Sequence, residues 1–238
     1  MAAPVPRPTR LSRPTRPAAA VRLPAALWLP VAAGLVVLAA LWAGPLARAS
    51  ATSFAAHMAV HMGLVTVVAP LIAIGIAGSR YDPTPRHPLL FGPLPASLVE
   101  LLVVWGWHAP LLHGWARTSG TGYILEQGSF LAAGLVVWIA CLGRGARGPR
   151  GQSLLGTLGL LLTSIHMTLL GALIAFAGRP LYSHALAGLH GTDIDPLAVI
   201  ADQQFGGIIM LLMGGAAYLA GGVVLMARMF RQTGETAS

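Results

Sequence analysis

Residues 53–76 read SFAAHMAVHMGLVTVVAPLIAIGI, and this stretch decides the fold class. It contains no Asp, Glu, Lys or Arg, and its length is close to the roughly 20 apolar residues that a helix needs to cross a bilayer. Comparable apolar runs recur along the chain. The sequence therefore predicts an all-α, polytopic transmembrane bundle of about six spans, at residues 25–43, 53–76, 94–112, 121–142, 153–178 and 198–228.

The composition excludes several other classes of protein. Of the 238 residues, 55% are hydrophobic and only 9% are charged, whereas a soluble domain carries charge on about a quarter of its positions. A soluble globule, an intrinsically disordered chain and a nucleic-acid-binding protein are all excluded on this ground. Cys141 is the only cysteine, so neither an intramolecular disulfide nor a paired-thiolate metal motif can form.

The distribution of arginine predicts the orientation in the membrane. Residues 1–24 combine arginines with prolines and are expected to form a disordered, basic cytoplasmic arm. Residues 25–230 then form the six-helix domain, and residues 231–238 a cytoplasmic tail. With both termini inside the cell, the outer loops keep only Arg48, Arg117 and Arg179, while all other arginines lie inside. We therefore expect a multi-pass protein of the cell inner (plasma) membrane, with both termini cytoplasmic.

Ionisable side chains inside a membrane are costly and usually face the bundle interior, so each one marks a candidate functional site. His57 and His61 are four residues apart and share one face of the second span. In the predicted topology, five spans place a histidine or a carboxylate in the outer half or at the middle of the membrane, and Glu100 near the inner end of the third span is the exception. The clustered residues are His57, His61, His108, Glu126, His166 and Asp202.

Imidazole, carboxylate and thioether groups that converge in an apolar interior are typical of a transition-metal site, and methionine favours cuprous copper. We expect His57 and His61 to be the first ligands and His108 and His166 to complete the site. Glu126 and Asp202 would then orient imidazoles or balance charge. Met58 and Met62 are interpreted mainly as packing residues, although methionine could serve a transfer state. His87, His113, His184 and His190 are assigned no role.

Two features of the spans concern packing. Pro70 lacks a backbone N–H, which frees the carbonyl of Thr66 and suggests a kink in the second span. Gly207, Gly214 and Gly221 recur at sevenfold spacing in the last span. Such a stripe of small residues allows a neighbouring helix to approach closely.

Four motifs resemble the polytopic cytochrome c oxidase assembly factor CtaG of caa-type oxidases. They are His57-Met-Ala-Val-His61-Met with Ala69-Pro-Leu after it, Trp107-His-Ala-Pro110, Leu125-Glu126 followed by Phe130 and Trp138, and Asp202-Gln-Gln-x-Gly-Gly207-x-x-Met210. The resemblance covers roughly residues 50–230 and implies that His57, His61, His108, Glu126 and Asp202 form the family's polar signature. The family's Glu is commonly followed by His, and Gln127 stands in that place here.

The resemblance implies a membrane assembly factor for cytochrome c oxidase that supports copper delivery near the extracytoplasmic side. The expected partners are the lipid bilayer and either cytochrome c oxidase subunits or a copper donor protein. On this interpretation the protein is a metallochaperone rather than an enzyme.

Two alternatives use the same residues. One is an intramembrane zinc hydrolase, with three histidines on zinc and Asp202 or Glu126 as general base. The other is a b-type haem protein with axial ligands among His61, His108 and His166. A proton-coupled transporter is a weaker interpretation.

Overall fold

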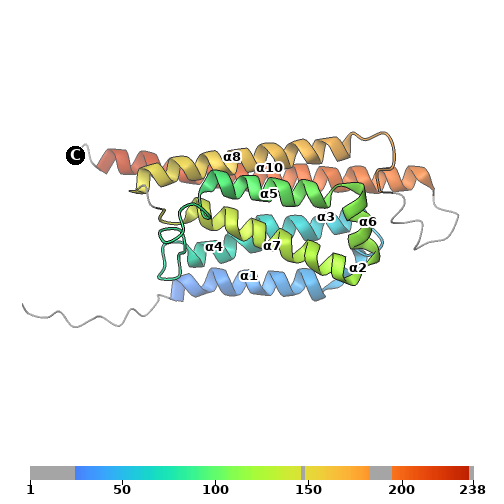
Figure 1. The fold of residues 1–238 in the computed structure, drawn as a ribbon, viewed down its shortest axis with the longest axis horizontal. Coiled ribbons are helices and arrows are strands. Elements are labelled where there is room, and N and C mark those ends of the chain that lie inside the picture. Colours follow the sequence, from blue (N-terminus) through green and yellow to red (C-terminus); the bar gives the residue numbers. More distant parts are fainter. Residues whose placement is uncertain (1–24, 146–147, 183–194, 236–238) are drawn as a thin grey trace, which may run out of the picture.

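The computed structural model describes residues 25–145, 148–182 and 195–235, which form a bundle of helices with nearly parallel axes (Figure 1). The predicted arm, residues 1–24, lies outside the described residues. The elements are α1 (Ala25–Ala43), α2 (Pro45–Ala49), α3 (Phe54–Gly63), the π-helical turn η1 (Leu64–Val68), α4 (Ala69–Ile76), α5 (Pro93–Trp107), α6 (Pro110–Thr118), α7 (Gly120–Leu142), α8 (Gly148–Ala175) and α10 (Pro196–Glu235).

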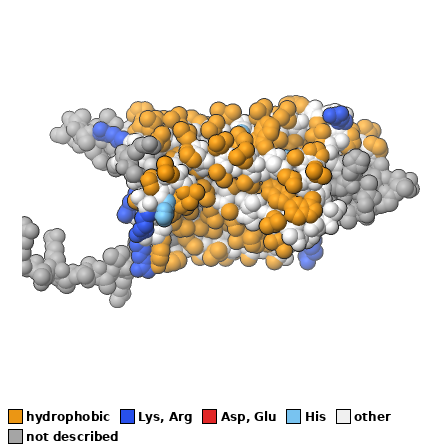
Figure 2. Space-filling model, in the orientation of Figure 1, with side chains coloured by type: hydrophobic (Ala, Val, Ile, Leu, Met, Phe, Trp, Pro, Cys, Tyr) orange, Lys and Arg blue, Asp and Glu red, His pale blue; other side chains and the backbone are white. Residues whose placement is uncertain are grey.

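The prediction of a polytopic helical membrane protein is confirmed. In the described part of the chain, five helices are long and apolar enough to cross a membrane, or six when α5 and α6 count as one bent span. Hydrophobic side chains cover the flank of the bundle between its two ends (Figure 2). α1 has the predicted bounds, α8 begins earlier than predicted, and α10 continues through Glu235 into the predicted tail.

The third span differs from its prediction, residues 94–112. Helix α5 ends at Trp107, and α6 leaves it at an angle of 71°. Pro110 explains the break, because a proline disfavours helical geometry in the residue before it, and Ala109 is extended with ψ 131°. The bend folds α6 back across the end of the bundle, where it packs against α7.

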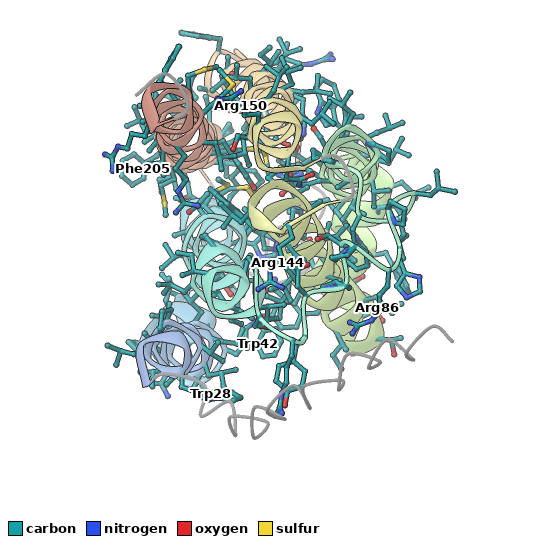
Figure 3. The ribbon with its side chains drawn as sticks, turned by 90° about the vertical axis from the view of Figure 1, so that its left-hand side faces the viewer. Trp28, Trp42, Arg86, Arg144, Arg150 and Phe205 are labelled. Carbon is teal, nitrogen blue, oxygen red and sulfur yellow. The ribbon has the colours of Figure 1, made fainter. Side chains whose placement is uncertain are left out.

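The two ends of the bundle differ in their side chains. Arginines gather at the end where α4 and α7 finish and α8 begins, which we call the arginine end (Figure 2). Seen from that end, α7 lies in the middle of the bundle, and α1, which carries Trp28 and Trp42, lies at its edge (Figure 3). The opposite end, where α3, α7 and α10 begin, is called the histidine end. That it faces away from the cytoplasm stays a prediction.

Gly207 of the glycine stripe packs against the neighbouring helix as predicted. A Cβ on Gly207 would lie 2.5 Å from the backbone nitrogen of Ala175, and a Cβ on Gly171 would lie 2.8 Å from that of Leu211. The backbones of α8 and α10 therefore approach each other where any larger residue would separate them.

Pro70 coincides with an irregular turn in the second span. Around Thr66 the chain forms the π-helical turn η1, in which the N–H of Ala69 donates to the carbonyl of Leu64. In this register the partner of the Val65 carbonyl would be Pro70, which has no N–H. The indole of Trp138 on α7 donates to that carbonyl instead, at 2.8 Å. The turn directly follows the segment that carries His57 and His61.

Candidate metal centre

Three side chains from two helices meet at the histidine end. His57 and His61 lie on consecutive turns of α3, and Glu126 lies about two turns into α7, whose first turn is capped by Ser119. All three are buried. Each offers one ligand atom that lies within 4.8 Å of the other two, and no other group of three or more such residues occurs among those described.

The carboxylate of Glu126 lies between the two imidazoles. Its Oε1 atom is 3.2 Å from Nε2 of His57, and its Oε2 atom is 3.4 Å from Nε2 of His61. The two ring centroids are 4.2 Å apart. Neighbouring ligands of a tetrahedral ion bound at about 2.0–2.2 Å are separated by about 3.3–3.6 Å, so the two nitrogen–oxygen distances are close to those between ligands of one ion.

Arg117 sets the protonation of His57. Its Nη1 atom is 3.1 Å from Nδ1 of His57, and its Nη2 atom donates to the carbonyl of Ala51. A guanidinium has donors only, so Nδ1 of His57 must accept this bond. In the neutral ring the hydrogen is then on Nε2, from which it is donated to Glu126. The hydrogen bonds therefore run from Arg117 through His57 to Glu126.

His61 lies against Phe130 and Gln127. Its ring stacks on Phe130 with centroids 4.1 Å apart, and its Nε2 atom is 2.8 Å from Nε2 of Gln127. Nδ1 of His61, Oε2 of Glu126 and Oε1 of Gln127 are buried and form no hydrogen bond with any described residue. The 3.4 Å contact between His61 and Oε2 is thus a close approach without a hydrogen bond. Unpartnered buried polar atoms are costly, and a cation bound between the imidazoles would partner Oε2 of Glu126.

His108 lies next to this group without belonging to it. It caps the end of α5, and its ring centroid is 6.5 Å from that of His61. Its Nδ1 atom is 2.6 Å from the carbonyl of Val104, and its Nε2 atom is 3.3 Å from Sδ of Met58.

Asp202 forms hydrogen bonds with the start of α3. One carboxylate oxygen accepts from the hydroxyl of Ser53 at 2.8 Å, and the other accepts from the backbone N–H of Phe54 at 2.6 Å. Asp202 therefore joins α10 to the start of α3, where a negative charge stabilises the free N–H groups of the helix. It orients the helix that carries the histidines and lies outside the group of three.

His166 is buried in α8, and neither of its ring nitrogens has a hydrogen-bond partner in the described part of the chain. It also lies outside the group of three. The structure thus brings together His57, His61 and Glu126, places His108 beside them, and separates Asp202 and His166 from them. That the six hold a metal stays a prediction.

Sequence reasoning missed three contacts of the group. The predicted topology places Arg117 in an outer loop, Gln127 enters only as a departure from a family pattern, and His113 is assigned no role. His113 is buried, with its ring centroid 5.3 Å from that of His57. Arg117 and His113 both lie on α6, so the signal that could have located them is Pro110, which bends α6 over the site.

Comparison with known proteins gives one match. Residues 9–232 match the family model described as cytochrome c oxidase caa3 assembly factor. No curated protein and no solved structure matches the chain. The match covers nearly the whole chain, including every residue of the site described above. The chain therefore belongs to the cytochrome c oxidase caa3 assembly factor family.

Proposed function

We propose that this membrane protein binds a copper ion at His57, His61 and Glu126 as cargo for the assembly of cytochrome c oxidase. The observation that carries the proposal is the group of two imidazoles and one carboxylate, buried together with ligand atoms within 4.8 Å of one another. Imidazole is a good ligand for copper, and the carboxylate balances the charge of the ion.

The surrounding residues prepare the group for a cation that is held and then released. Asp202 fixes the start of α3, and Phe130 holds the ring of His61 by stacking. A metal on Nε2 of His57 displaces the hydrogen from that atom, and Arg117 must leave Nδ1 so that the ring can carry its hydrogen there. Arg117 therefore opposes loading and limits how tightly the cargo is held.

The partners of the protein in this proposal are the bilayer and either oxidase subunits or a copper donor protein on the extracytoplasmic side. Arg117 also lines a cavity of about 500 Å³ at the histidine end, together with Arg48, Ser50 and Tyr123. This cavity lies next to the buried group through Arg117, so it is the place where we expect cargo to be exchanged. The protein acts as a metallochaperone in this proposal, without a chemical reaction of its own.

The test is metal analysis of the purified full-length protein after reconstitution with copper, beside the double variant His57→Ala, His61→Ala. We expect about one fewer bound copper ion in the variant. His87→Ala, which changes an exposed loop histidine, is the matched control and should retain full copper. Equal copper in the wild type and the double variant would overturn the assignment.

The same samples separate the alternatives. Bound zinc without copper would favour the zinc hydrolase, and a Soret band would favour the haem protein. In cells that lack this protein, the double variant should fail to restore the copper content of the oxidase.

A further inference from the structure

The hydrogen bonding of His108 leaves one of its nitrogens with a free lone pair. Its Nδ1 atom is 2.6 Å from the carbonyl oxygen of Val104, and a carbonyl can only accept, so Nδ1 carries the hydrogen. In the neutral ring, Nε2 therefore has no hydrogen. The ring is buried, and no carboxylate among the described residues forms a hydrogen bond with it, so a charged ring would lack the partner that burial requires.

The neighbour of this lone pair is another acceptor. Sδ of Met58 lies 3.3 Å from Nε2 of His108, and a thioether sulfur has no hydrogen to donate. Two electron-pair donors thus face each other in the buried interior with no hydrogen between them. Such a contact gains nothing as a hydrogen bond, whereas a cation between the two atoms would bind both.

We propose that Met58 and His108 form a second metal site, distinct from the group at Glu126, which takes a soft monovalent cation such as Cu(I). Thioether sulfur favours Cu(I) over the harder divalent ions, and imidazole accepts both. The site extends the proposed function by giving the protein a place for the reduced form of the metal. It stands on its own contacts, since neither residue belongs to the group of His57, His61 and Glu126.

The geometry suits an ion with an open coordination position. With metal–nitrogen and metal–sulfur bonds of about 2.0 and 2.3 Å, a separation of 3.3 Å corresponds to an angle of about 100° at the ion. This angle leaves room for one or two further ligands. The ring centroid of His61 is 6.5 Å from that of His108, so the second site lies beside the first.

The residues around the pair hold it in place. Tyr182 donates to the backbone carbonyl of His108 at 3.1 Å, which fixes the end of α5. Gly206 on α10 lies against Met58, and a Cβ at that position would be 3.1 Å from Cγ of Met58. A Cβ there would come closer still to the ring of Phe54, 2.5 Å from its Cδ1 atom, so a larger residue would displace both side chains.

The experiment uses full-length protein in detergent with methionine methyl groups labelled by ¹³C, titrated with Ag(I) as a probe of Cu(I) that does not change its oxidation state. We expect the Met58 methyl resonance, assigned by its loss in Met58→Leu, to shift on addition of about one equivalent of Ag(I). Met213→Leu, at a partly buried methionine outside the pair, is the matched control and should bind Ag(I) as the wild type does.

Zn(II) binding to the same samples distinguishes this proposal from the first. Met58→Leu should lose one equivalent of Ag(I) and bind Zn(II) like the wild type, because the imidazole and carboxylate group is untouched. His57→Ala, His61→Ala should lose Zn(II) and still shift the Met58 resonance. A Met58 resonance that ignores Ag(I) in the wild type, or unchanged Ag(I) binding by a folded Met58→Leu protein, would overturn the second site whatever the Zn(II) result.

Discussion

Glu126 and Glu100 are both fully buried, on the neighbouring helices α7 and α5, yet their surroundings differ. Glu126 lies between His57 and His61, with Arg117 and Gln127 behind these rings. Glu100, nearer the arginine end, accepts a hydrogen bond from the hydroxyl of Tyr218 at 2.7 Å, and its Oε2 atom has no hydrogen-bond partner among the described residues.

This difference separates the proposed metal site from a structural hydrogen bond. Nitrogen ligands around Glu126 supply what a transition metal needs besides a carboxylate. The described residues that form hydrogen bonds with Glu100 offer a hydroxyl group only, which neither balances a negative charge nor binds copper well. Burial of a carboxylate inside a membrane protein therefore does not identify a metal site by itself. The neighbouring side chains decide its role.

The strongest test of the comparison exchanges each carboxylate for an amide. Glu126→Gln keeps the shape of the side chain but removes the charge, so we expect copper affinity to fall by at least about a hundredfold, or roughly 2.7 kcal/mol. Glu100→Gln should leave copper affinity within about threefold of the wild type, because its carboxyl lies outside the group. Competition titration against a copper indicator measures both. A larger loss in Glu100→Gln than in Glu126→Gln would reverse the assignment.

The second test concerns Arg117, which lies beside the Glu126 group and has no counterpart among the described hydrogen-bond partners of Glu100. Arg117→Gln replaces a guanidinium that can only donate by an amide that can accept from Nδ1 of His57. Removal of the positive charge and release of the ring should together tighten copper binding by about tenfold. The ¹⁵N shifts of His57 in the metal-free protein should also move from one dominant tautomer toward a mixture.

Arg48→Gln is the matched control for this test. Arg48 lines the same cavity but forms no hydrogen bond with His57. An equal gain in affinity in both variants would show that only the overall charge near the site matters, and the role of Arg117 in orienting His57 would be abandoned.

The contrast between the two glutamates also shows what the sequence could predict. The spans follow from hydropathy, which is a local property, so α1 and α7 lie within a residue of their predicted bounds. His57 and His61 share a face because of helical periodicity alone. That Glu126 joins them depends on α7 packing against η1, the turn that follows α3, and the predicted depth was enough to suggest it.

The contacts that the sequence could not provide depend on breaks and packing. Arg117 reaches His57 only because the chain bends by 71° between α5 and α6. The depth of Asp202 predicts that it lies at the site. Both of its carboxylate oxygens instead accept hydrogen bonds from Ser53 and Phe54 at the start of α3. His166 has the predicted burial without the predicted neighbours. Which helix carries each of these residues is thus predictable from sequence, while the direction of its side chain is not.

Asp82 provides the smallest and most general test, because this carboxylate lies outside the spans, in the loop between α4 and α5. Its partners are the hydroxyl of Thr84 at 2.6 Å and the backbone N–H groups of Gly78 and Arg144 at 2.8 and 2.9 Å. Burial alone would raise the pKa of Asp82, but these hydrogen bonds, led by that of Thr84, hold the pKa below its ordinary value. The loop is thereby attached to the end of α7.

A depressed pKa stabilises the folded state above the unfolded-state pKa of about 3.9, and that contribution is lost as the pH falls through the lower folded-state value. Asp82→Asn should therefore reduce stability by about 1 kcal/mol at pH 7, and the gap to the wild type should close below about pH 4. Thermal unfolding in detergent measures both. The control is Asp195→Asn, at the start of α10, where Asn caps a helix as well as Asp does. If the difference in stability between Asp82→Asn and the wild type were the same at pH 3 as at pH 7, the charge of Asp82 would not contribute to stability. The conclusion that neighbouring side chains decide the role of a carboxylate would then not hold for Asp82.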